Sequence, residues 1–292
     1  MNKLKVAIQK SGRLYEDSLK LLKECGINIQ FRKNQLKAFA LNFPLEIFFL
    51  RDDDIPQYLE DSIADIGIVG ENIFSEKRKR IQVKERLGFG KCRLSIAIPR
   101  QLNYRGIKDL NGKRITTSYP ILVQEFLTKH SIDAEIQEIS GSVELAPSIG
   151  LSYCICDLVS SGSTLFMNGL KEVETLLQSE AILASSMSIE EDPIGKKLMK
   201  ELLFRILAVR NAKNNKYILL NAPIKKLDKI MSYLPTYLPK NLTLTISPLL
   251  INSQLCVIHA VISEKEFWRV AENLKIFGVF NILVMPIEKI IY

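Results

Sequence analysis

The feature that most constrains the fold is an alternation that runs through residues 1–215. Short apolar, β-branched runs alternate there with amphipathic stretches, a pattern typical of α/β layering with parallel strands. Strands are expected at residues 5–9, 45–50, 66–69, 93–98, 114–116, 134–138 and 153–159. Helices are expected at residues 14–25, which Gly26 would end, and at residues 56–61, which Pro56 would begin.

The remainder of the chain predicts a separate small domain. Residues 193–213 carry apolar side chains at helical spacing and lead into a polar cluster, which indicates a linking helix and a boundary. Beyond it we expect strand 217–222, helix 224–234, strands 242–246 and 255–262, helix 264–277 and strand 281–285. This βαββαβ order is that of a ferredoxin-like domain.

Composition narrows the class of protein. A chain of 292 residues, 47% hydrophobic and 25% charged, predicts two or three folded domains. We find neither a signal-peptide core nor an apolar run near the roughly 20 residues of a membrane helix, so a cytoplasmic protein without membrane contact is expected. The five cysteines are scattered and are expected to be reduced.

The net charge of +8 indicates an anionic partner. Its basic residues are dispersed and lack the dense, aromatic-interleaved stripe of a nucleic-acid surface, so nucleic-acid binding is not expected. With only two histidines, a histidine-based metal cage or catalytic triad is not credible. Chemistry that needs no protein nucleophile fits this inventory.

One loop carries the strongest local signal for phosphate binding. A strand-like run that contains Asp157 ends at Val159. The turn and the expected helix start that follow it have the sequence Ser160, Ser161, Gly162, Ser163, Thr164 and Leu165. A Gly/Ser/Thr loop that opens a helix can turn several backbone N–H groups toward one phosphate. The alternative is an ordinary turn in which Ser163 caps the helix.

A second loop places two cations after the first strand. Lys10 and Arg13 flank Gly12 and could neutralise a pyrophosphate or triphosphate, although exposed surface charge explains them equally well. An aspartate stands five residues before a glycine both at Asp65 and at Asp157. This echo suggests two similar lobes whose strand ends face one cleft.

Acidic groups complete the set of candidates. Asp52 and Asp53 could hold Mg²⁺ through water near bound phosphates, but the interpretation we favour is that Asp53 or Asp54 simply caps the following helix. Glu71 directly follows a glycine at an expected strand end, and Glu144 stands three residues after a glycine in a segment that precedes a helix. We assign no dedicated metal cage to the protein.

These motifs together resemble the long-form ATP phosphoribosyltransferases. The segments that carry the resemblance occur in order along the whole chain, at residues 9–14, 51–56, 65–72, 90–95, 117–120, 141–144, 157–165 and 282–289. The resemblance implies that adenine N1 of ATP displaces pyrophosphate from phosphoribosyl pyrophosphate with Mg²⁺ on the phosphates, the first step of histidine biosynthesis. A non-catalytic two-lobed ligand-binding or regulatory subunit is the alternative.

The resemblance also implies an architecture: a two-lobed, periplasmic-binding-protein-like catalytic region followed by the ferredoxin-like (ACT-like) domain. Lobe I with the linking helix would comprise residues 1–92 and 181–213. Lobe II with the phosphate loop would comprise residues 93–180. Residues 216–292 would form a regulatory domain that binds L-histidine at positions not identified, and dimers would assemble into hexamers.

The resemblance further implies roles for individual residues. The loop from Ser160 to Leu165 would hold the 5′-phosphate of the ribose. Asp157 and Glu144 would accept hydrogen bonds from the ribose hydroxyls, and Glu71 is a weaker substrate-binding candidate. Lys10, Arg13 and Arg93 would neutralise pyrophosphate and the phosphates of ATP. No general base is assigned, because adenine N1 is itself a nucleophile.

Overall fold

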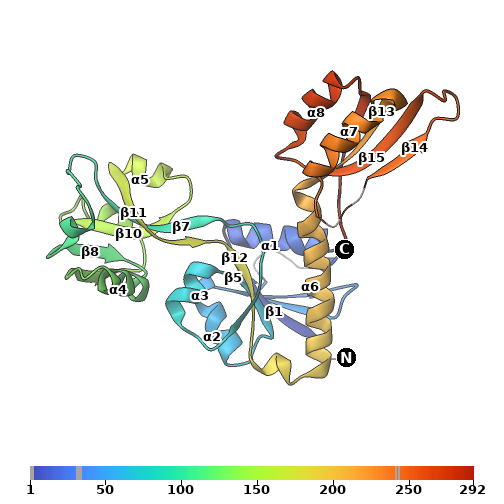
Figure 1. Ribbon diagram of the computed structural model, residues 1–292. Helices are drawn as coiled ribbons and strands as arrows, with labels where there is room; N and C mark the ends of the chain where they lie inside the picture. The colour runs from blue at the N-terminus through green and yellow to red at the C-terminus, as the bar shows by residue number, and fades with distance from the viewer. Residues whose placement is uncertain (1–2, 31–34, 241, 243) are drawn as a thin grey trace. The chain divides into compact units, whose positions relative to one another are not determined.

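The structure is a computed structural model that describes residues 3–30, 35–240, 242 and 244–292. The chain forms two compact units, one extending to Met199 and the other beginning at Lys200. Figure 1 shows two sheets in the first unit and one in the second. Within the described ranges, no helix is both long and apolar enough to cross a membrane.

A seven-stranded sheet forms the first half of the N-terminal unit. Its strands lie in the order β2 (Ile29–Gln30), β3 (Lys37–Ala40), β4 (Leu45–Leu50), β1 (Leu4–Gln9), β5 (Ile66–Gly70), β12 (Ala181–Ser185) and β6 (Gln82–Arg86). Strand β1 is parallel to both β4 and β5, so the carboxyl ends of these three strands meet at one edge. The adjoining helices are α1 (Arg13–Glu24), α2 (Ile55–Glu60) and α3 (Glu71–Lys77).

A five-stranded sheet forms the second half of the same unit. Its strands lie in the order β11 (Leu170–Ser179), β7 (Cys92–Pro99), β10 (Cys154–Val159), β8 (Arg114–Thr117) and β9 (Glu135–Glu138). Helices α4 (Pro120–Lys129) and α5 (Ser163–Met167) cover its opposite faces (Figure 1). Cys154 and Cys156 are fully buried in the core that includes α4, as expected for core thiols.

The chain crosses between the two sheets twice. It leaves the seven-stranded sheet between β6 and β7 and returns between β11 and β12. Because β12 enters its sheet from the other lobe and not through a covering helix, it pairs antiparallel with β5; β7 likewise pairs antiparallel with β10. The expectation of parallel strands is therefore correct for β1 with β4 and β5 and for β8 with β9 and β10, and wrong for β7 with β10. The result is the two-lobed, periplasmic-binding-protein-like fold.

The C-terminal unit has the expected ferredoxin-like order. After α6 (Pro193–Lys213) it contains β13 (Asn215–Pro223), α7 (Leu227–Tyr233), β14 (Thr245–Pro248), β15 (Leu255–Ser263), α8 (Phe267–Ile276) and β16 (Phe280–Pro286). The strand order is β14-β15-β13-β16, and every pair is antiparallel. The strand expected at 242–246 begins at Thr245; residue 243 lies outside the described residues.

Packing around Gly67 gives a prediction of stability. A Cβ atom added at Gly67 would lie 2.8 Å from Cγ2 of Ile55 and 3.1 Å from Cδ1 of Leu59, both fully buried. We expect Gly67→Ala to lower the free energy of unfolding by about 2 kcal/mol, the cost of overpacking a core. Thermal unfolding measures the change. Gly141→Ala is the matched control, because nothing lies within 4 Å of its added Cβ; equal unfolding temperatures would contradict the packing argument.

Candidate functional site

The Ser160 to Leu165 loop joins a buried strand to a short helix. Strand β10 ends at Val159, and α5 begins at Ser163 after Gly162 turns the backbone with a φ of 79°. Gly162 occupies the capping position, so Ser163 is the first helical residue and not the cap that the alternative interpretation required. Leu165 is buried and anchors the helix to the sheet through a cluster that includes Val159. The turn is thereby fixed at both ends.

Two arginines from distant parts of the chain converge on this loop. Nη1 of Arg13, at the start of α1, donates to Oγ of Ser160 over 3.2 Å. Nη1 of Arg93, on β7, donates to the backbone oxygen of Ser160, also over 3.2 Å. Arg93 is there because β7 pairs with β10 in a register that sets Arg93 opposite Val159. The structure thus brings together residues 13, 93 and 160, which the sequence had offered as separate candidates.

Asp157 lies on the same strand, just before the loop, and is half-buried. Burial raises the pKa of its carboxyl, and the charge of Glu144 raises it further, while the backbone N–H of Leu158, 2.7 Å from Oδ1, opposes the shift. Glu144 stands on the 3₁₀ turn Val143–Leu145. Two carboxylates that repel one another in a partly buried place favour a ligand that donates hydrogen bonds to both.

The acidic run of the first lobe lies at the carboxyl edge of its parallel strands. Burial raises the pKa of Asp52, and repulsion from the charge of Asp53 raises it further. Oδ1 of Asp53 lies 3.5 Å from Nζ of Lys77. Asp54 occupies the capping position of α2, as the capping interpretation expects, but its side chain makes no capping bond to the described residues, because a 3₁₀ turn leads directly into the helix. The capping interpretation is therefore correct for the position and not for the bond.

Lys10 belongs to the same edge. Its backbone N–H donates to the carbonyl oxygen of Leu50 over 2.8 Å, which continues the pairing of β1 with β4. Its side chain is exposed. Among the described residues, no group of three or more His, Cys, Asp or Glu side chains is close enough to hold a metal ion.

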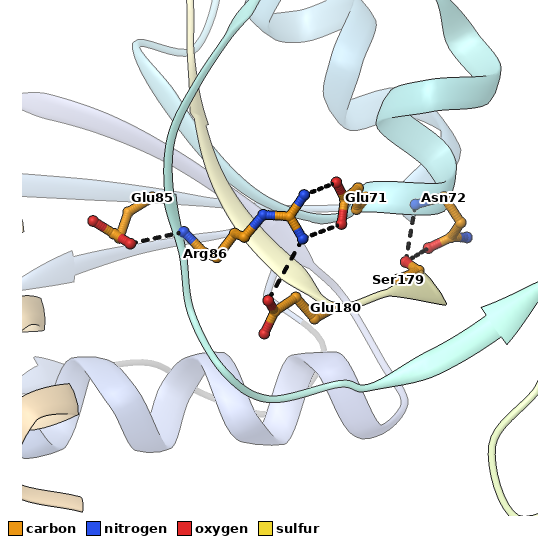
Figure 2. Close-up of polar contacts among 6 residues, drawn as sticks. All are labelled: Glu71, Asn72, Glu85, Arg86, Ser179 and Glu180. Atoms are coloured by element: carbon orange, nitrogen blue, oxygen red, sulfur yellow. Dashed lines mark hydrogen bonds and ion pairs between the residues drawn. The ribbon is translucent and has the colours of Figure 1, made fainter. Parts of the chain in front are cut away.

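Glu71 is engaged in an ion-pair cluster at the crossovers. Figure 2 shows its carboxylate accepting hydrogen bonds from both terminal nitrogens of Arg86. One of these nitrogens, Nη1, lies 3.7 Å from Oε1 of Glu180. Beside this cluster, Oγ of Ser179 accepts from the backbone N–H of Asn72 and donates to Oδ1 of that residue, each over 3.0 Å. Glu71 is grouped with the crossover strands and not with Asp157.

A basic pocket adjoins the loop and includes residues that the sequence analysis missed. Its volume is about 390 Å³, and it is lined by Arg86, Lys91, Cys92, Arg93, Ser160, Gln178, Ser179 and Glu180. One wall, Lys91 to Arg93, lies in the segment 90–95 that carries the family resemblance. The other wall could not be inferred, because β11 reads as a polar stretch and was not expected to be a strand. A pocket with three basic side chains beside a glycine loop can bind a substrate that carries several phosphates.

Comparison with known proteins gives consistent matches along the chain. A family model described as ATP phosphoribosyltransferase matches residues 51–208, and the model for the C-terminal domain of the same family matches residues 212–289. Relatives of that name in Cytophaga hutchinsonii and Bacteroides thetaiotaomicron are 50% and 47% identical, with 99% of this chain covered and 98% and 99% of theirs. The ATP phosphoribosyl transferase (HisG:HisZ) complex of Thermotoga maritima is 29% identical, covers 70% of this chain and 98% of its own, and has a TM-score of 0.59.

Proposed function

The chain belongs to the ATP phosphoribosyltransferase family, and from this premise we propose how its own residues carry out the reaction. The activity is that of a pentosyltransferase in histidine biosynthesis. The lone pair of adenine N1 in ATP forms a bond to C1′ of phosphoribosyl pyrophosphate, while the C1′–O bond breaks and its electron pair leaves with pyrophosphate. The products are N1-(5-phosphoribosyl)-ATP and pyrophosphate.

The convergence of Arg13 and Arg93 on Ser160 carries our assignment of the site. We place the 5′-phosphate in the loop from Ser160 to Leu165. The two guanidinium groups contact Ser160 at the border of that loop. We expect them to neutralise the charge that pyrophosphate would accumulate as it leaves. Lys10 would add a third cation from the edge of the first lobe. Catalysis would then come from orientation and electrostatic stabilisation.

The ribose would lie against Asp157 and Glu144. Carboxylates accept hydrogen bonds from both hydroxyls of a cis-diol. Such bonds would stabilise the ionised form of Asp157, whose pKa is raised by burial and, to a smaller extent, by the charge of Glu144. Glu71 stays a weaker substrate-binding candidate, since Arg86 already occupies its carboxylate. No protein base is needed to activate adenine N1.

Mg²⁺ would enter bound to the substrate phosphates and supply charge neutralisation. The chemistry of the nearby donors suits it: repulsion from Asp53 contributes to the raised pKa of Asp52, and a hydrated cation beside them would relieve that repulsion. Because the two aspartates are the only protein groups we assign to it, the contact is proposed to run through water.

We keep the proposed division of the chain: lobe I with its linking helix at 1–92 and 181–213, lobe II at 93–180 and the regulatory domain at 216–292. The match of the family's C-terminal-domain model supports histidine binding in the last of these. Edge strand β16 exposes Leu283, Val284 and Met285, and an apolar edge favours contact with another chain, consistent with dimers that build hexamers. A cytoplasmic location is proposed because ATP is available there.

The absorbance rise of N1-(5-phosphoribosyl)-ATP tests both parts of the proposal. Purified protein would be mixed with ATP, phosphoribosyl pyrophosphate, Mg²⁺ and pyrophosphatase, with and without L-histidine. We expect a rise that histidine suppresses. A rise that ignores histidine would remove the regulatory proposal and keep the enzyme, whereas no rise from folded protein would favour a non-catalytic ligand-binding or regulatory subunit.

A further inference from the structure

Glu172 lies at the centre of a polar cluster beside the phosphate loop. Its carboxylate accepts hydrogen bonds from Nε and Nη2 of Arg93. It also accepts one from Oγ of Ser95 over 2.7 Å, and Oγ1 of Thr175 lies 3.4 Å away. One carboxylate therefore fixes two of the three guanidinium nitrogens of Arg93, and the pairing lowers the pKa of Glu172.

An irregularity in β11 aims Glu172 at this cluster. Residues two apart on a regular strand point to the same face of a sheet. In β11 the register shifts between Glu172 and Glu174, so that Glu172 lies opposite Ala97 whereas Glu174 lies opposite Ile96. The two glutamates consequently face opposite sides. Oε1 of Glu174 accepts instead from the hydroxyl of Tyr104 over 2.7 Å.

Glu172 projects from the same face of the five-stranded sheet as the residues proposed to bind the substrate. Ser95 lies opposite Asp157 in the pairing of β7 with β10, and Thr175 lies opposite Ser95 in the pairing of β11 with β7. Directly opposed residues of an antiparallel pair project to the same side. Arg93, two residues before Ser95, projects there too and directs its remaining nitrogen, Nη1, to the backbone oxygen of Ser160.

We propose that Glu172 is a positioning residue: its bidentate hold on Arg93 presets the guanidinium against the Ser160 loop before phosphoribosyl pyrophosphate binds. A long cation that is ordered in advance saves the entropy of ordering it when the substrate arrives. The inference rests on the proposed function of this loop. It assigns Glu172 no contact with the reacting atoms, so its effect is exerted through Arg93.

The test compares Glu172→Gln with Glu174→Gln, the same change on the same strand but on the opposite face. Each purified full-length variant is assayed at saturating ATP while phosphoribosyl pyrophosphate is varied. For Glu172→Gln we expect kcat/KM for this substrate to fall about 10-fold, with KM raised and kcat lowered, because Arg93 is proposed both to bind the substrate and to stabilise the charge that develops on pyrophosphate. Glu174→Gln should leave both parameters near those of the wild type. Equal KM values in the two variants would overturn the inference.

A double-mutant cycle separates positioning from a general effect on the sheet. If Glu172 acts through Arg93, adding Glu172→Gln to Arg93→Gln should change KM by less than about 2-fold, because coupled residues are not additive. If the double variant instead raises KM by the product of the two separate effects, the inference is overturned, whatever the unfolding temperatures of the variants.

Calorimetric binding of phosphoribosyl pyrophosphate alone distinguishes this inference from the proposed function. A wild type that binds the substrate but forms no product would contradict the proposed function, while a weaker affinity in Glu172→Gln than in Glu174→Gln would still support the positioning role. Unchanged affinity in Glu172→Gln would overturn it. A wild type that does not bind phosphoribosyl pyrophosphate would contradict both.

Discussion

Asp157→Asn is expected to lower kcat/KM for phosphoribosyl pyrophosphate by about 100-fold, because two charge-assisted hydrogen bonds to the ribose would be weakened and each contributes about 1.5–3 kcal/mol. Asparagine keeps the size of the side chain but offers a single neutral acceptor oxygen. The absorbance assay gives kcat and KM directly. A loss smaller than about 3-fold would contradict the role of Asp157 at the ribose.

The raised pKa of Asp157 supplies a control for folding. Burial, and after it the charge of Glu144, raise this pKa above its value in the unfolded chain. The folded state therefore holds the proton more tightly, and stability falls as pH rises from the unfolded to the folded pKa. At neutral pH the ionised carboxyl is a cost to the fold that Asp157→Asn removes. We expect the variant to unfold at the wild-type temperature or above, so lost activity would not reflect unfolding.

The same shift sets the acid limb of the activity profile. The diol needs the ionised carboxylate, so activity should fall as pH drops through the raised pKa of Asp157. Glu144→Gln removes one cause of the shift and should move this limb to lower pH. An acid limb that stays in place in Glu144→Gln would show that the two carboxyls are not coupled.

Local patterns predicted most of the fold. The loop at 160–165, the helix that begins within it and the helix expected at 14–25, which the structure shows as α1 at Arg13–Glu24, follow from the placing of glycines and of apolar runs. Strands β11 and β12, between which the chain returns to the first lobe, were not predicted. In β11 most side chains are half-exposed and two carry carboxylates, so the strand lacks the apolar run by which the others were found. The antiparallel pairing that it makes with β7 depends on where the chain crosses between lobes, which no local pattern encodes.

The site was predicted as separate pieces. Arg13 and Ser160 are 147 residues apart, and only the closeness of the two lobes joins them. Glu71 was placed correctly at a strand end, but its partner Arg86 lies on β6, which was not expected to be a strand. The role proposed for Glu172 depends on a register shift, and such an irregularity has no signature in the sequence.

Arg13→Gln is expected to reduce kcat/KM by about 100-fold, the cost of removing one charged donor from a site where negative charge develops. Arg13 is the first residue of α1, where the helix dipole disfavours a cation. Glutamine should therefore leave α1 as stable as before or slightly more stable. Arg13→Lys should recover only part of the activity, because an ammonium cannot present the planar fork of a guanidinium.

The matched control for Arg13→Gln is Lys20→Gln on the same helix. Lys20 forms an exposed pair with Glu24 at 4.0 Å, so the substitution removes the same charge away from the loop. Both variants lower the net charge equally and should weaken long-range attraction of anions to the same small extent. A large loss in Arg13→Gln alone therefore reports contact with substrate. Equal, small losses would reduce Arg13 to a surface charge and leave the phosphate loop to Arg93.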